Sequence, residues 1–173
     1  MMERIAWFER RFSFELPVWM YSNVLERLRG TPARLEDRLR DVPRELLVRR
    51  VGDKWSIQEH AGHLLDLEAL EIKRLEDYTA GRETLTPADL QNRKTYEAEY
   101  NSKEIEEILK AFRKERMEFV ERLEALDEEF VERSAIHPRL NLPMRVIDLA
   151  FFKAEHDDHH LARISELIRT LKK

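Results

Sequence analysis

The chain has 173 residues, a formal net charge of −4 at pH 7, and 38% charged against 42% hydrophobic residues. This length is that of one ordinary domain with its own core, and we expect residues 1–173 to form a single domain. The acidic balance excludes the basic surface that nucleic-acid binding needs, and the absence of cysteine excludes disulfides, thiolate ligands and a cysteine nucleophile.

Glycine and proline are scarce, at 4 and 6 residues, which favours long amphipathic helices over a β-fold with many turns. The N-terminus carries charged residues in place of the apolar core of a signal peptide. The longest charge-free run, residues 16–25, is about half of the ~20 residues that a membrane-spanning helix needs. We therefore expect a soluble, cytoplasmic protein without membrane partners.

Residues 1–15 are rich in aromatic side chains and predict an irregular or short helical arm. From Pro17 to Leu28, apolar residues recur at helical spacing. The tripeptide Gly30-Thr31-Pro32 predicts a break in this helix, because glycine can close one helix, threonine can cap the next and proline suits its first turn. The second piece is expected to end before Pro43.

Ser56 and Glu59 have the spacing of a capping box, which predicts the start of the next helix. This helix is expected to end just before Gly81, a suitable C-terminal glycine. Residues 82–100 are polar and predict a long crossover, with one short helix starting near Ala88.

Asn101 and Glu104 resemble a second capping box, and the apolar residues of the helix that follows repeat as far as Leu126. Residues 132–143 predict the last connection, and a final helix is expected from about residue 144 to residue 171. Together the pattern predicts an all-α four-helix bundle with a long crossover before the third main helix and a short N-terminal arm. Because such bundles often pair through apolar helix faces, we also expect a homodimer.

Six histidines are present, and His156 and His160 lie one turn apart in an otherwise apolar row of the last helix. Two core histidines satisfied by hydrogen bonds would explain this pattern, but a shared divalent metal would also remove the cost of burying them. His159 lies off this row and is expected at the surface or behind the ligands. His137 precedes a proline in a connection, where a surface position is the default.

A third ligand is expected from the upstream pair, and helical angles alone slightly favour His60 over His63. The pattern K-W-S-x-x-E-x-x-x-H-L-x-D at residues 54–66, with H-x-x-x-H-x-x-x-I at residues 156–164, resembles the DinB/YfiT-like superfamily. The resemblance extends over essentially the whole chain and implies a four-helix bundle with a metal site. It maps the three ligands onto His63, His156 and His160.

Further residues are candidates for supporting roles. Asp66 lies one turn from His63 and can orient its ring. Glu59 is explained by the cap, with a catalytic base as the alternative. Arg163 stands where many members of the resembled family have glutamine; it can hold an anionic substrate group or form a salt bridge. Trp55 is expected to pack at the helix entrance rather than to line a pocket.

Three neutral histidines with an open position favour zinc, with nickel, iron or manganese as alternatives. Some members of the resembled family transfer low-molecular-weight thiols such as bacillithiol, mycothiol or glutathione, which implies a thiol S-transferase acting on a small-molecule electrophile. The alternatives are a metal-dependent hydrolase and a non-catalytic, stress-related metal-binding protein. The sequence leaves the substrate and the metal open, as well as the participation of His60 or His159.

Overall fold

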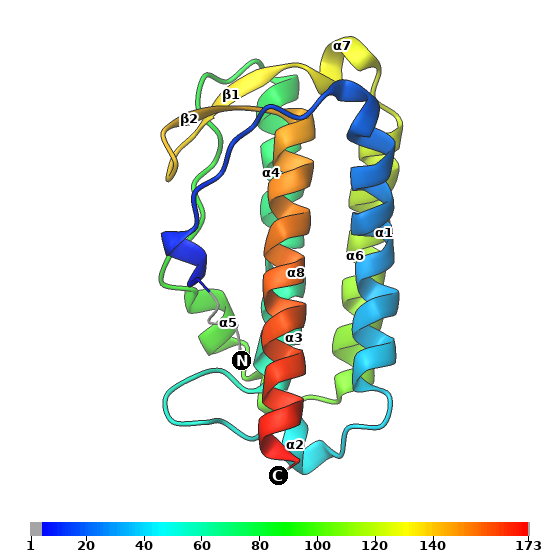
Figure 1. Ribbon diagram of the computed structural model, residues 1–173, viewed down its shortest axis with the longest axis vertical. Helices are drawn as coiled ribbons and strands as arrows, with labels where there is room; N and C mark the ends of the chain where they lie inside the picture. Colours follow the sequence, from blue (N-terminus) through cyan, green and yellow to red (C-terminus); the bar gives the residue numbers. More distant parts are fainter. Residues whose placement is uncertain (1–4, 173) are drawn as a thin grey trace.

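The computed structural model describes residues 5–172 and confirms the four-helix bundle. Its long helical segments are α1 (Tyr21–Leu39), α3 (Ile57–Asp66) with its continuation α4 (Glu68–Thr79), α6 (Ile105–Glu124) and α8 (Val146–Leu171). Figure 1 shows α1 and α8 running in one direction, and α3–α4 and α6 in the opposite direction. Both α1 and α3 pack against α6 and α8, which closes the bundle.

The connections contain short elements. The helical ones are η1 (Trp7–Glu9), η2 (Val18–Met20), α2 (Arg44–Leu47), α5 (Arg93–Glu97), η3 (Tyr100–Ser102) and α7 (Glu128–Val131). The crossover helix α5 therefore begins later than the expected start near Ala88. In addition, β1 (Ser134–His137) and β2 (Leu142–Arg145) form an antiparallel hairpin that the sequence pattern did not predict. Figure 1 shows the N-terminal arm and the crossover on the same side of the bundle.

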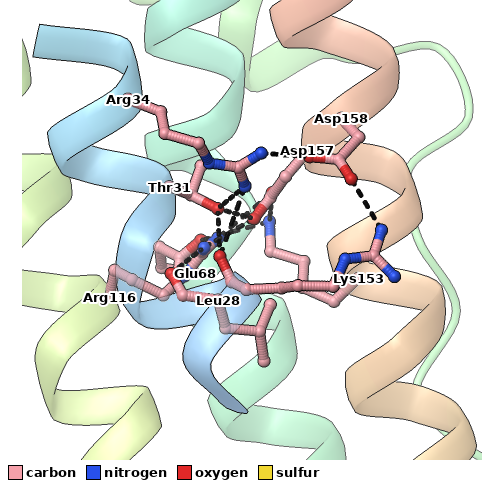
Figure 2. A network of polar contacts seen from close by, with 9 residues as sticks. Leu28, Thr31, Arg34, Glu68, Arg116, Lys153, Asp157 and Asp158 are labelled. Atoms are coloured by element: carbon pink, nitrogen blue, oxygen red, sulfur yellow. Dashed lines mark hydrogen bonds and ion pairs between the residues drawn. The ribbon is translucent and has the colours of Figure 1, made fainter. Parts of the chain in front are cut away.

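The predicted break at residues 30–32 is wrong, because α1 continues through Pro32 to Leu39. Proline lacks an N–H group, so it leaves the carbonyl of Leu28 without its helical donor. Arg116 of α6 replaces that donor, with Nη1 3.1 Å from the Leu28 carbonyl oxygen (Figure 2). A side chain from another helix thus allows the proline to remain inside α1.

The ends of the other helices follow the predictions in part. Ser56 and Glu59 form the predicted capping box at the start of α3, and Gly81 has the positive φ of +65° expected after α4. The second predicted box is wrong: α6 begins after Glu104 with no side-chain cap, and Asn101 instead accepts a hydrogen bond of 2.7 Å from the Ser56 hydroxyl.

The apolar core consists of two clusters, one on each side of a buried layer of charge. In this layer Arg116 donates to both Glu68 and Asp157, and Lys153 lies 3.1 Å from Glu68 and 3.4 Å from Asp157 (Figure 2). Burial alone would raise the pKa of Asp157, but the charges of Arg116 and Lys153 lower it below its usual value. Two cations therefore balance two carboxylates, and Asp157 is fully buried.

No helix in the described part of the chain combines the length and the apolar character that crossing a membrane requires.

Candidate metal centre

Three histidines converge inside the bundle, His63 from α3 and His156 and His160 from α8. One ring nitrogen from each lies within 4.8 Å of the others. The Nε2 atoms of His156 and His160 are 3.1 Å apart, close to the roughly 3.3 Å that separates two nitrogens on one tetrahedral zinc ion. The donor set and its spacing therefore fit a single divalent metal.

The surroundings keep these rings in the form that binds metal. Burial, and then the positive charge of Lys153, lower the pKa of His63 to about 3. Burial likewise holds the pKa values of His156 and His160 well below the usual value for histidine. A neutral imidazole offers a lone pair to a metal ion, whereas an imidazolium does not. The site is thus made of three neutral donors.

The orientation of His63 is set by a residue of the crossover. Its Nδ1 lies 3.1 Å from the hydroxyl of Thr95, which in turn donates to Asp66 Oδ2 at 2.8 Å. Tyr100 donates to the other oxygen of Asp66 at 2.6 Å. Because the Thr95 hydroxyl donates its hydrogen bond to the carboxylate, its oxygen is left to accept a hydrogen bond from the Nδ1–H of His63. The Nε2 of His63 therefore carries the free lone pair.

Asp66 acts on His63 through this chain of hydrogen bonds and not through direct contact. Thr95 itself was missed by sequence reasoning, since it lies in a polar crossover that carries no periodic signal.

The second upstream histidine, which helical angles favoured as a ligand, lies behind the triad. His60 Nδ1 is 2.8 Å from the Nδ1 of His160, so His60 can orient that ring. Trp55 packs its ring 4.7 Å from the ring of His63 and lines the adjoining cavity, contrary to the expectation that it would serve only the helix entrance.

A cavity of about 330 Å³ adjoins the triad. Its walls include Trp7 from the N-terminal arm, residues 87–90 of the crossover and Phe152 from α8. The Trp7 ring lies 4.8 Å from the ring of His156 and 5.1 Å from that of Phe152. The arm therefore forms one wall of the site.

Other candidate residues lie elsewhere than expected. His137 is buried, 2% exposed, and lines the cavity, because the unpredicted hairpin packs it against Phe152. His159 is half-buried beside Trp7 and His160 and lines the cavity, rather than lying at the surface or behind the ligands.

Glu59 and Arg163 do not line the cavity. Glu59 accepts hydrogen bonds from Arg50 and from the backbone of Ser56, which occupies its carboxylate in the helix cap. Arg163 donates to Glu166 at 2.8 Å, as the salt-bridge alternative predicted. Glu59 is therefore not available as a catalytic base, and Arg163 is not available to bind an anionic group of the substrate.

Comparison with known proteins shows the family and the fold of the chain. The model of the DinB superfamily matches residues 27–164. The chain belongs to the DinB superfamily. Solved structures similar to this DinB-superfamily chain include YfiT from Bacillus subtilis, described as a probable metal-dependent hydrolase with an unusual four-helix bundle topology.

YfiT is 16% identical, with a TM-score of 0.83 and 94% of each chain covered. A protein from Streptococcus pneumoniae is 14% identical, with a TM-score of 0.65 and coverage of 94% of this chain and 92% of the other. At these sequence identities, the similarity shows that this chain shares its fold with both proteins. No curated protein matches the chain.

Proposed function

We propose that this protein is a metal-dependent enzyme that hydrolyses a small-molecule substrate in the cytoplasm. The observation that supports the proposal is the convergence of three buried, neutral histidines in the wall of a cavity of about 330 Å³. Hydrolysis is favoured over other metal chemistry because YfiT, which shares the fold, is described as a probable metal-dependent hydrolase.

His63, His156 and His160 would hold the metal, with zinc favoured and nickel, iron or manganese as competitors. When bound, such an ion lowers the pKa of water and polarises a carbonyl oxygen. Three protein ligands leave a coordination position for these groups. Thr95 and His60 hold the rings of His63 and His160 in place, so that the donors need little rearrangement.

The residues of the cavity wall would position the substrate and limit the access of water. Trp7, Trp55 and Phe152 surround the triad with aromatic surface. Such surface binds the apolar part of a ligand and lowers the local dielectric, which strengthens the polar interactions within the site. The substrate class that follows is a small, partly apolar ester or amide.

The proposal is tested by assaying zinc-loaded protein against a panel of small esters and amides. We expect metal-dependent hydrolysis that falls by at least about 100-fold in His160→Ala, since one ligand is lost. The control is Arg163→Ala on the same helix, which removes a side chain that does not line the cavity and is expected to retain activity. Equal activity of wild type and His160→Ala would contradict the proposal.

The same protein preparations distinguish hydrolysis from thiol transfer. Bacillithiol, mycothiol or glutathione is added together with an aromatic chloride as the electrophile. Conjugation that requires both the thiol and the metal, without hydrolysis of any ester or amide, would overturn the hydrolase proposal and support the S-transferase implied by the sequence resemblance.

A further inference from the structure

Several polar side chains line the cavity besides the triad, among them Glu71, Arg74 and Lys153, and two more lie at the tip of the β1–β2 hairpin. His137, Pro138 and Arg139 line it there. Arg139 and His137 approach Phe152, with the guanidinium 5.7 Å and the imidazole 5.2 Å from its ring. Phe152 lies four residues before His156 on α8, a rise of about 6 Å. The hairpin tip is therefore about one helical turn from the triad.

His137 presents a donor with no acceptor in the described chain. The backbone N–H of Leu140 donates to its Nδ1 at 3.2 Å, so the proton of the neutral ring lies on Nε2. That Nε2 atom is buried and has no hydrogen-bond partner among residues 5–172. Burial, followed by the charges of Arg74 and Arg139, lowers the pKa of His137 to about 3, which keeps the ring neutral. An unsatisfied buried donor is costly unless a ligand supplies the acceptor.

Arg139 presents a charge with no counter-ion among the residues that the structure describes. Its guanidinium lies over the rings of Phe8 and Phe152, and its Nη2 is buried without a hydrogen-bond partner in the described residues. No carboxylate of residues 5–172 lies within ion-pair distance of Arg139. The neighbouring Arg74 differs, since it donates to the carbonyl of Thr86 and to Glu71.

We propose that Arg139 and His137 form a subsite for a carboxylate group of the substrate. A carboxylate has two coplanar oxygens, so it can accept hydrogen bonds from a guanidinium and from an imidazole N–H at the same time. Its negative charge would also balance the positive charge of Arg139. The proposal rests on the proposed function in one respect: the hydrolysed bond would lie toward the triad, a few bonds from the carboxylate. The substrate class is then an ester or amide of a short acid that keeps a second, free carboxylate.

The subsite can be tested without turnover by using pentanoate as the probe and pentanamide as its neutral isostere. Binding is measured by NMR titration of protein treated with a chelator, so that no metal can bind the carboxylate. We expect saturable binding of pentanoate, at least tenfold weaker binding of pentanamide, and at least tenfold weaker binding of pentanoate to Arg139→Gln. Arg139→Lys keeps the positive charge but loses the planar guanidinium, and its affinity for pentanoate is expected to lie between those of wild type and Arg139→Gln.

The matched control is Arg133→Gln, because Arg133 also stacks on a phenylalanine, Phe130, but is exposed and outside the cavity. It is expected to bind pentanoate like wild type, and thermal unfolding checks that each variant is folded. Equal binding of the acid and the amide, or unchanged binding to folded Arg139→Gln, would overturn the subsite. Failure of the metal site would leave pentanoate binding intact, so the two proposals fail separately.

Discussion

The ring of His63, in α3, is oriented by Thr95, which lies in the crossover helix α5 beyond α4. The hydroxyl of Thr95 accepts a hydrogen bond from the Nδ1–H of His63 and donates one to Asp66, whose other oxygen accepts a hydrogen bond from Tyr100. All of these groups are buried, so each hydrogen bond lacks competition from water. The metal-binding lone pair of His63 therefore depends on a hydroxyl in the crossover.

Thr95→Val tests this dependence, because valine keeps the shape of threonine but removes the hydroxyl. We expect about 10- to 100-fold weaker zinc binding, measured by competition with a coloured chelator, since a group behind a metal ligand typically has this effect. Thr95→Ser retains the hydroxyl and should stay close to wild type. Zinc binding by Thr95→Val equal to that of Thr95→Ser would show that the hydroxyl does not orient the ligand.

At the scale of the element, the start of α3 combines a capping box with an ion pair. Glu59 accepts from the Ser56 backbone at 2.8 Å and from Arg50 Nε at 2.9 Å. Burial alone would raise the pKa of Glu59, but these hydrogen bonds and the charge of Arg50 lower it below its usual value. A carboxylate with a lowered pKa in the folded state stabilises the fold above its unfolded pKa of about 4.3.

This sign predicts how stability changes with pH. The contribution of Glu59 is fully present at neutral pH and is lost as pH falls through its folded pKa. Glu59→Gln should therefore lower the free energy of unfolding at pH 7 by about 1 kcal/mol, and the difference from wild type should shrink in acid. Urea denaturation between about pH 7 and pH 3 measures this, and a difference independent of pH would contradict the assignment.

The continuity of α1 depends on α6 through Arg116, which is fully buried and serves the Leu28 carbonyl, Glu68 and Asp157 (Figure 2). Arg116→Met keeps much of the side-chain volume but leaves two buried carboxylates opposite one lysine. It should destabilise the protein by about 3–5 kcal/mol, since a broken buried ion pair leaves charge uncompensated.

The control for Arg116→Met is Arg113→Met on the same helix. Arg113 pairs with Glu36 at the surface, with its side chain 43% exposed, and its loss should change stability by less than about 1 kcal/mol. Chemical denaturation gives both values. Similar losses in the two variants would mean that the buried layer is not a principal source of stability.

At the scale of the whole molecule, local patterns predicted the bundle and long-range contacts decided the exceptions. The capping box of Ser56 and Glu59 uses residues three positions apart, so the sequence displays it directly. The continuity of α1 through Pro32 depends on Arg116, far along the chain, and no local pattern could reveal that donor. Local propensity therefore predicted a break that tertiary structure removes.

The candidate site was predictable to a similar degree. The spacing of His156 and His160 indicates a shared face on one helix, and the family resemblance selects His63 as their companion. Thr95 contacts His63, and His137 lines the cavity, only because the crossover and the hairpin fold back over the bundle, and neither segment carries a periodic signal. The homodimer stays a prediction; the structure describes an exposed large apolar side chain, Trp19, 74% exposed, just before α1.

The metal content of untagged protein tests the central claim most directly. Elemental mass spectrometry would be applied to wild type, His160→Ala and the control His159→Ala, a neighbouring histidine outside the triad. We predict about one divalent ion per chain in wild type and His159→Ala, and its loss in His160→Ala. Absence of metal from wild type even after reloading with zinc or nickel, or its full retention in His160→Ala, would contradict a metal centre formed by the triad.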